Sequence, residues 1–379
     1  MRSLHRRFGI EEEFFLCDEK SGSLVRRRSN NFFRECAEVL GASFSHEVLD
    51  CQIELKTSIL VSAEQAKREI VEGRQKLIAI ARRHGLRVLA AGTHPLAQWR
   101  LQSFSPGLRY DDLQRDFRIV AHRSLLCGLH VHVEVPETVD RIWLINEVMG
   151  TLPLLLSLSA SSPYWSGQDT GLSSYRQSAY DEWPRTGIPP NFSDEQDYRR
   201  YVELLRRTQA ISDESFIWWA IRPSSRYPTV ELRITDSCPL ATDALCIAEI
   251  FRAVVHQCVQ EWTRGTDLQP DPISRLVVEE NRWRAKRFGT SARFINSLSE
   301  SEKTVRETID ALRQRSLTSI RSLQADWAFD RAKKIVESGS SADRQRAVFD
   351  IAISTGTRSP KSALQAVVSA LIAETAHEG

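Results

Sequence analysis

The chain lacks the features that mark disulfide-rich, zinc-ribbon or membrane-spanning proteins. It has only seven cysteines in 379 residues, an odd number, and no C-x-x-C pair. This argues against a disulfide framework and a zinc ribbon, and it favours a reducing cytoplasm. No run of about 18 apolar residues occurs, so we do not expect a membrane span. The basic start MRSLHRR is not followed by an apolar segment of signal-peptide length.

Glycine-rich nucleotide signatures and a strong net charge are also missing. Neither G-x-G-x-x-G nor G-x-x-x-x-G-K-[ST] occurs, so a bound nucleotide would not use a Rossmann or P-loop cradle. The formal net charge is only +2, which gives no reason to expect nucleic acid or a membrane surface as a partner. We therefore expect small-molecule partners.

Alternating polar and apolar residues predict strands that each have one polar face. The predicted strands lie at 7–16, 47–57, 86–91, 127–135, 216–222 and 228–236. Such half-polar strands favour an antiparallel or mixed sheet over a buried parallel sheet. The aromatic-rich segment 161–195 has no periodicity, and it is predicted to be an ordered, functional loop.

Helical patterns cover most of the remaining chain. They lie at 62–84, 138–160 and 195–211, and from 240 to the end with breaks near 265–271, 288–300, 338–341 and 354–360. For the first helix, Ser62 and Gln65 form a capping-box signature, and Gly85 is a natural stop.

Ionisable side chains gather on the polar face of four predicted strands. They are Glu11, Glu13, Gln52, Glu54, His130, His132, Glu134, Glu231 and Arg233. A solvent-exposed sheet face would also place polar residues at alternate positions, so one strand alone decides little. As a set, however, clustered carboxylates repel one another unless cations offset them. Carboxylate oxygens with one histidine suit Mg²⁺ or Mn²⁺.

The pair His130 and His132 keeps two other interpretations open. The histidines could be a hydrogen-bonded structural pair, or they could bind Zn²⁺ from one strand face as in some hydrolases. The alternative function would then be a zinc-dependent amide hydrolase.

Arginines form a second set of candidate site residues. Arg222, Arg226 and Arg233 lie around two predicted strands, and a further group occurs in ENRWRAKRFG at 280–289. Arginine pairs bidentately with phosphate and carboxylate. For Arg284 and Lys286 a solvated basic face is the simpler explanation. Cations that bind phosphate beside neutralising arginines are what phosphoryl transfer requires.

Seven segments between residues 8 and 290 together resemble a known family. They are FGIEEEFFL at 8–16, QIELKT at 52–57, AGTHPLAQW at 91–99, GLHVHVEV at 128–135, SASSPYWSGQDTGLSSYR at 159–176, AIRPSSRYPTVELRITDSCPL at 220–240 and ENRWRAKRFG at 280–289. In sequence and order they are similar to glutamate–cysteine ligase family 2, the carboxylate–amine ligases of the glutamine-synthetase-like superfamily.

The resemblance implies an α+β fold in a single catalytic domain, 1–379, with the motifs in 1–290 and a helical part in 291–379. The implied sheet is curved and largely antiparallel. Its concave polar face would hold ATP, metal ions and substrate, and helices would pack outside. The implied metal ligands are Glu11, Glu13, Glu54, His130 and Glu231. The implied catalytic residues are Arg233, Glu54 and Arg222, and the nucleotide-binding residues are Arg233, Arg282 and Arg287. The implied substrate contacts are Arg222, Tyr175, Arg176 and His132.

The implied activity is an ATP- and Mg²⁺- or Mn²⁺-dependent ligation of a γ-carboxylate, such as that of glutamate, to an amine through an acyl phosphate. We expect amino acid substrates and a cytoplasmic location, and the helical last third could supply the surface of a homodimer. Two positions depart from the family pattern. Ala220 replaces the Asp that usually precedes I-R-P, and Lys56 stands where a small residue is common. Ala220 is the sequence support for another alternative, a non-catalytic member that only binds a nucleotide.

Overall fold

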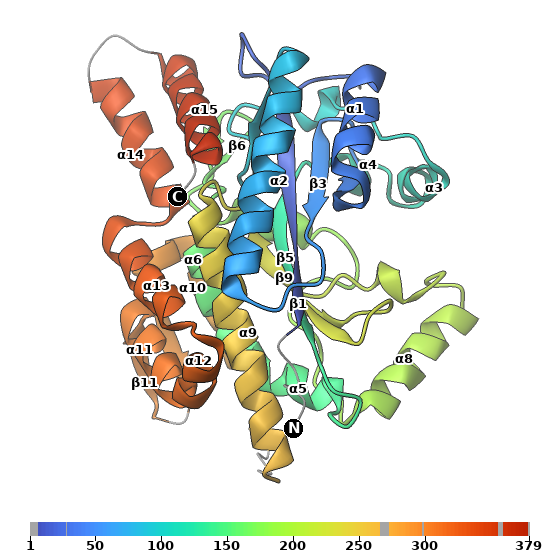
Figure 1. Ribbon diagram of the computed structural model, residues 1–379, viewed down its shortest axis with the longest axis vertical. Helices are drawn as coiled ribbons and strands as arrows, with labels where there is room; N and C mark the ends of the chain where they lie inside the picture. Colours follow the sequence, from blue (N-terminus) through green and yellow to red (C-terminus); the bar gives the residue numbers. More distant parts are fainter. Residues whose placement is uncertain (1–6, 28, 266–272, 298, 355–358, 378–379) are drawn as a thin grey trace.

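A seven-stranded sheet forms the centre of the computed structural model (Figure 1). The structure describes residues 7–27, 29–265, 273–297, 299–354 and 359–377. The strand order is β2 (Phe44–His46), β3 (Gln52–Lys56), β1 (Phe8–Asp18), β5 (Gly128–Glu134), β9 (Thr229–Asp236) and β8 (Ile221–Pro223), and β4 (Leu86–Leu89) also pairs with β1. Every pairing in this sheet is antiparallel, so the predicted sheet type is confirmed.

The strand register brings the polar residues of different strands side by side. Glu11 lies opposite Lys56 on one neighbour and opposite His130 on the other. Glu13 lies opposite Glu54. Because side chains alternate between the two faces of a strand, directly opposed residues share a face. The register therefore collects the acids and histidines on one side of the sheet.

The other side of the sheet is apolar and is covered by helices. Figure 1 shows α2 (Ala63–Arg83) and α9 (Ala241–Thr263) running along this side. α5 (Arg141–Val148) and α6 (Leu152–Ser159) contribute to the same core, which includes Ile10, Val131 and Leu232. Each fully buried large apolar side chain contributes about 1.5–3 kcal/mol. This core fixes the orientation of the polar face.

Helix α2 begins and ends as its sequence predicts. The hydroxyl of Ser62 accepts a hydrogen bond from the backbone N–H of Gln65 at 3.2 Å. The side chain of Gln65 accepts from the N–H of Val61 at 3.1 Å, one residue before the cap position that a capping box would use. Gly85 follows the helix with φ +67°, a conformation that glycine adopts at little cost.

Smaller helices surround the sheet in the first two-thirds of the chain, and the remaining chain is mostly helical. The first group is α1 (Asn30–Leu40), α3 (Leu108–Phe117), α4 (Ile119–His122), α7 (Tyr175–Tyr180) and α8 (Glu195–Arg207). The second group is α10 (Ser274–Phe288), α11 (Val305–Arg315), α12 (Leu317–Leu323), α13 (Asp326–Ser338), α14 (Ser341–Ser354) and α15 (Pro360–Ala376). Within the second group, α13 packs against α9 and α15 against β4.

Several predicted elements need correction. The strand predicted at 216–222 is only β8, because the preceding residues bond to a loop: Trp218 donates to Arg185 and Ala220 donates to Gly187. The helix predicted at 138–160 starts at Arg141 and is split by a 3-10 turn. The structure also shows hairpins that the sequence analysis missed, β6 (Tyr164–Trp165) with β7 (Gln168–Asp169) and β10 (Arg293–Asn296) with β11 (Ser301–Thr304). The predicted breaks near 265–271 and 354–360 lie largely outside the described residues.

One helical stretch of the described chain, Arg141–Ser159, is long and apolar enough to cross a membrane by length and composition. This stretch is not a continuous apolar run in the sequence, because Asn146 and Glu147 interrupt it. In the fold, 78% of its apolar window is buried, as in a core helix of a soluble protein. All seven cysteines are buried and free, so the expectation of no disulfide framework is confirmed.

A buried ion pair joins the sheet to α2. Glu12 points to the apolar side of β1, where its carboxylate accepts from Nε of Arg74 at 3.2 Å. Arg74 also donates to the carbonyls of Pro239 at 2.6 Å and Cys238 at 2.8 Å. Both side chains are 4% exposed. The pair thus connects β1, α2 and the segment that enters α9.

We predict that Arg74→Met lowers the free energy of unfolding by about 3–5 kcal/mol, because it leaves the Glu12 carboxylate buried without its partner. The double variant Glu12→Leu/Arg74→Met should recover part of this loss. Urea unfolding at neutral pH measures both. Arg68→Met, on the exposed face of the same helix, is the matched control. Equal stability of Arg74→Met and this control would contradict the prediction.

Candidate active site

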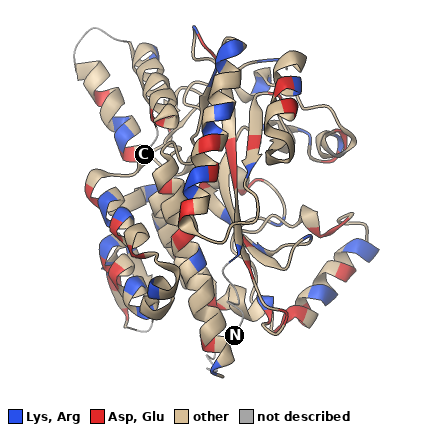
Figure 2. Cartoon of the chain, viewed as in Figure 1, with Lys and Arg blue, Asp and Glu red and all other residues tan. Residues whose placement is uncertain are grey.

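A cavity of about 380 Å³ opens on the polar face of the sheet. Its floor is formed by β1, β3, β5, β8 and β9. Its walls are completed by the end of β2 and the residues after it at 45–48, by residues at 124–126, 215–218 and 224–227, and by side chains from α3 and α7. Figure 2 shows acidic residues on the central strands. The predicted polar face therefore lines a real cavity, not an open surface.

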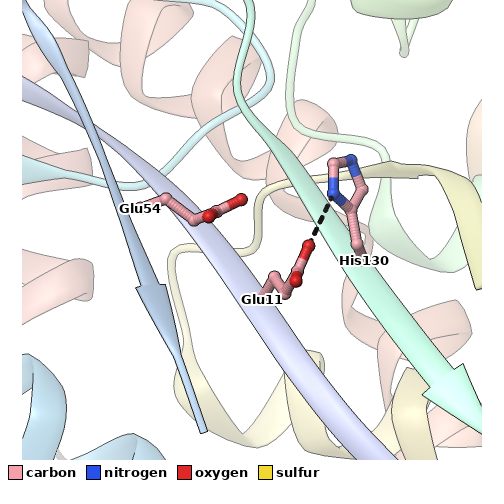
Figure 3. Close-up of side chains that lie close together, drawn as sticks. All are labelled: Glu11, Glu54 and His130. Atoms are coloured by element: carbon pink, nitrogen blue, oxygen red, sulfur yellow. Dashed lines mark ion pairs between the residues drawn. The ribbon is translucent and has the colours of Figure 1, made fainter. Parts of the chain in front are cut away.

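Two groups of potential metal ligands share Glu54 at the acidic end of this cavity. The first contains Glu11, Glu54 and His130, and the second contains Glu13, Glu47 and Glu54. Within each group the potential ligand atoms lie within 4.8 Å of one another. Figure 3 shows the first group, with Nδ1 of His130 at 3.6 Å from Oε2 of Glu11. Three adjacent strands supply this first group.

The carboxylates of this acidic end repel one another. Burial and the negative charge of Glu11 raise the pKa of Glu54 to about 8. Burial and the charges of Glu13 and Glu54 also raise the pKa of Glu47. Burial opposes ionisation of Glu11 too, but contacts with His130 and His132 hold its pKa well below the usual range. A bound divalent cation would relieve this repulsion.

His130 is suited to metal binding. Its side chain is buried, and neither ring nitrogen has a hydrogen-bond partner among the described residues. Burial and the positive charge of Arg233 lower its pKa, so the ring is neutral at pH 7. Neutral imidazole is the form that binds a metal. With carboxylate oxygens as its neighbours, this donor set fits Mg²⁺ or Mn²⁺.

The basic end of the cavity is organised around Glu231. Nε of Arg222 lies 2.8 Å from Oε2 of Glu231, and Arg233 contacts Oε1 of the same carboxylate. Although burial opposes ionisation, these arginines hold the pKa of Glu231 well below its usual range. Arg233 also donates to the hydroxyl of Tyr180 at 3.3 Å. Glu231 belongs to neither ligand group of the described residues, so its metal role stays a prediction.

Arg176 reaches the cavity across Gly128. A Cβ at position 128 would lie 2.2 Å from Nη2 of Arg176 and 3.1 Å from Nε2 of His130. Only glycine leaves room for both side chains. Arg176 is buried, and its Nη1 lies 3.4 Å from the carbonyl of Arg233. This predicted substrate residue is thus brought to the basic end.

Asp236 holds the loop that carries Arg176. Its buried carboxylate accepts from the N–H of Ser161 at 3.0 Å and from the hydroxyls of Ser162 at 2.6 Å and Ser174 at 2.9 Å. The hydroxyl of Ser162 in turn accepts from the N–H of Arg176 at 3.0 Å. These bonds explain why the segment 161–176, which has little regular structure, is ordered beside the cavity.

Three predicted site residues do not line the cavity. Arg282 is buried and contacts Asp181, and its Nη1 lies 2.8 Å from Glu279. Arg287 is exposed and donates to a loop carbonyl. Tyr175 packs against a tryptophan ring. The structure places these three side chains outside the cavity lining, and their nucleotide or substrate roles stay predictions.

His132 and two residues outside the predicted site list belong to the cavity. Nε2 of His132 lies 3.7 Å from Oε1 of Glu11, and its Nδ1 lies 3.1 Å from the hydroxyl of Thr229. Glu47 was missed because alternation in the predicted strand 47–57 put it on the apolar side, whereas in the structure it lies between β2 and β3. Lys56 was noted only as a departure from the family pattern, yet it lines the cavity. Its place on the polar side of the predicted strand 47–57 was the available signal.

We predict that the metal-free protein loses stability as pH rises from about 5 to 8. The pKa of Glu54 rises from 4.5 to about 8 on folding, so the folded state binds more protons than the unfolded state in this range. Glu54→Gln should stabilise the metal-free protein at pH 8 by about 1 kcal/mol or more. Saturating Mg²⁺ should stabilise the wild type more than this variant.

Thermal unfolding at several pH values, with and without Mg²⁺, measures both effects. Glu72→Gln, an exposed carboxylate of α2, controls for the loss of one surface charge. A metal-free Glu54→Gln protein that is less stable than the wild type at pH 8 would contradict the argument.

Comparisons with known proteins agree with this arrangement. The sequence model of glutamate–cysteine ligase family 2 matches residues 7–365. A provisionally named glutamate–cysteine ligase 2 of Ectopseudomonas mendocina is 43% identical over 368 residues, which cover 97% of this chain and 96% of that protein.

Two solved structures have a similar fold. The glutamate–cysteine ligase of Francisella tularensis, in complex with AMP, matches with a TM-score of 0.68 at 13% identity and covers 98% of this chain and 89% of its own. A bifunctional glutathione synthetase of Pasteurella multocida matches with a TM-score of 0.69 at 14% identity, over 98% of this chain and 53% of its own. At these identities the likeness concerns the fold, and it confirms the predicted fold class.

Proposed function

Because the chain belongs to glutamate–cysteine ligase family 2, we propose that it is an ATP-dependent ligase that joins a carboxylate to an amine. The observation that carries the proposal is the two-ended cavity. Carboxylates at one end can hold cations, and Arg176, Arg222 and Arg233 lie at the other end. These are the parts that phosphoryl transfer requires. The similar fold of a ligase solved with AMP supports a nucleotide substrate.

In this proposal the acidic end holds Mg²⁺ or Mn²⁺. The potential ligands are Glu11, Glu54 and His130 in one group and Glu13, Glu47 and Glu54 in the other. When bound, the cations neutralise charge on the nucleotide phosphates. The potential ligands lie on β1, β3 and β5, with Glu47 in the segment between β2 and β3, and the apolar core behind the sheet fixes these strands.

The arginines act on the transferring phosphoryl group. An acceptor carboxylate attacks the γ-phosphate, ADP leaves, and an acyl phosphate forms. Arg233 and Arg222 stabilise the negative charge of the phosphoryl oxygens. Glu231 keeps both guanidinium groups in place, because it contacts each of them. An amine then attacks the acyl carbon, loses a proton and displaces phosphate, which leaves an amide.

We propose the γ-carboxylate of glutamate as the acceptor and an amino acid amine, with cysteine as the first candidate, as the second substrate. Arg176 and His132 lie in the cavity, where they can contact carboxylate or amino groups. Ala220 does not line the cavity. It belongs to the apolar core, and its carbonyl accepts from the N–H of Arg233 at 2.9 Å. Replacement of the usual Asp by Ala220 therefore removes no member of the two ligand groups. This argues against a non-catalytic member.

No observation favours the zinc hydrolase. Among the described residues, neither ligand group contains both His130 and His132. Nδ1 of His132 is engaged with Thr229. The two ligand groups are instead dominated by carboxylates, which suit harder cations than Zn²⁺.

We predict amine-dependent release of ADP when the protein is given Mg²⁺, ATP and glutamate. A coupled ADP assay across a panel of amines that includes cysteine identifies the second substrate, and mass spectrometry identifies the amide. Glu11→Gln should abolish the release because it removes one carboxylate of the cluster that balances the positive charges at the acidic end. If no acid and amine pair releases ADP and the purified protein contains zinc, the ligase proposal fails and the hydrolase takes its place.

We predict that Arg233→Met lowers kcat by about 10²–10³-fold, the loss typical of a charge-stabilising donor. Binding of Mn²⁺ to the acidic end should change little, because Arg233 contacts Glu231 and not the four clustered carboxylates. The kcat of Arg233→Lys should lie between those of Arg233→Met and the wild type, since lysine keeps the positive charge but lacks the planar guanidinium group.

Steady-state kinetics and Mn²⁺ titration measure the two quantities. Arg200→Met, on the exposed surface of α8, controls for the loss of one positive charge. A normal kcat in Arg233→Met would exclude Arg233 from catalysis.

A further inference from the structure

Lys56 places a fixed positive charge inside the first ligand group. It lies on β3, on the same face as Glu54 and directly opposite Glu11. Its Nζ lies 2.8 Å from Oε1 of Glu54 and 3.9 Å from Oε1 of Glu11. Both carboxylates belong to the first ligand group, in which His130 is the third potential ligand of the cation. The ammonium therefore contacts the oxygens that a divalent cation would use.

Lys56 does not share the clustered carboxylates with another described lysine or arginine. In the described part of the chain, it is the one Lys or Arg side chain that forms ion pairs with any of the clustered carboxylates, which are Glu11, Glu13, Glu47 and Glu54. The nearby arginines Arg222 and Arg233 are paired with Glu231. Four carboxylates thus face one ammonium, and a net negative charge remains for added cations.

The two ligand groups differ in their distance from this ammonium. Lys56 contacts two members of the group Glu11, Glu54 and His130. In the other group it contacts only the shared Glu54, and no ion pair of a described Lys or Arg involves Glu13 or Glu47. Like charges repel strongly at such short range when they are partly buried. A divalent cation should therefore occupy the second group more readily.

We propose that the ammonium of Lys56 takes the place of one divalent cation. The protein then binds one divalent cation tightly, at Glu13, Glu47 and Glu54, and Lys56 neutralises the Glu11 and Glu54 side of the cluster. The choice of Mg²⁺ or Mn²⁺ rests on the proposed function. The binding itself can be measured without nucleotide or substrate, so a failure of the ligase proposal would be seen separately in the ADP assay.

The test counts Mn²⁺ ions bound to the full chain, from the electron paramagnetic resonance signal of free Mn²⁺ in a titration without nucleotide. We expect one tightly bound ion in the wild type. In Lys56→Met, which keeps the length of the side chain but removes its charge, we expect two. The second ion should bind at least about tenfold more tightly than any second ion in the wild type, because the competing ammonium is gone.

Two lysine variants serve as matched controls. Lys56→Arg keeps the positive charge and should retain one tight ion. Lys76→Met, which removes an exposed ammonium of α2 that pairs with Glu72, should also retain one. Lys56→Ser provides a second charge-free variant if Lys56→Met does not fold, as judged by circular dichroism.

Carboxylate variants assign the ions to their groups. Glu47→Gln should remove the tight ion of the wild type. Glu11→Gln, combined with Lys56→Met, should remove only the ion that Lys56→Met gained. An unchanged number and affinity of Mn²⁺ ions in Lys56→Met would overturn the proposal. So would two equally tight ions, or none, in the wild type.

Discussion

The mutual repulsion of four carboxylates on one face of a sheet is the constraint on which the site depends. Glu11, Glu13, Glu47 and Glu54 crowd together at one end of the cavity, and burial together with the charge of Glu11 raises the pKa of Glu54 to about 8. A protein that needed only stability would not keep such a cluster, because burying unpaired charge is costly. The cluster makes sense as a cation site that is completed on binding. Lys56 beside the cluster then offsets part of its negative charge.

The other side of the sheet supplies the rigidity that this repulsion demands. Apolar residues of β1, β5 and β9 pack against α2, α6 and α9, and the Glu12–Arg74 pair fastens β1 to α2 within this layer. On the cavity side, Asp236 fixes the loop that presents Arg176. The Glu12–Arg74 pair and Asp236 are thus buried charged groups that hold backbone segments in place. These contacts limit how far the carboxylates can move apart to relieve their repulsion, which favours the proposed binding of cations.

Strand alternation was enough to predict the sheet and most of its polar face. Glu11, Glu13, Glu54 and His130 occupy alternate positions on strands, so their common face follows from the period of two. Residues outside regular strands could not be placed in this way. Glu47 reaches the cluster from a turn, and the apolar segment at 216–220 resembles a strand but bonds to a loop. Helical periodicity was also insufficient for Arg282, because it could not show that this charge is buried against Asp181 and Glu279.

Glu231 explains how one cavity can keep an acidic and a basic end. If Arg222 and Arg233 were free, they would be drawn to the clustered carboxylates and would neutralise them without any metal. Glu231 lies between these arginines and binds both, so it holds them at the far end of the cavity. Their charges remain directed at the cavity because guanidinium groups have more donors than one carboxylate can use. The separation of charge would then orient a substrate whose phosphates bridge metal ions on one side and arginines on the other.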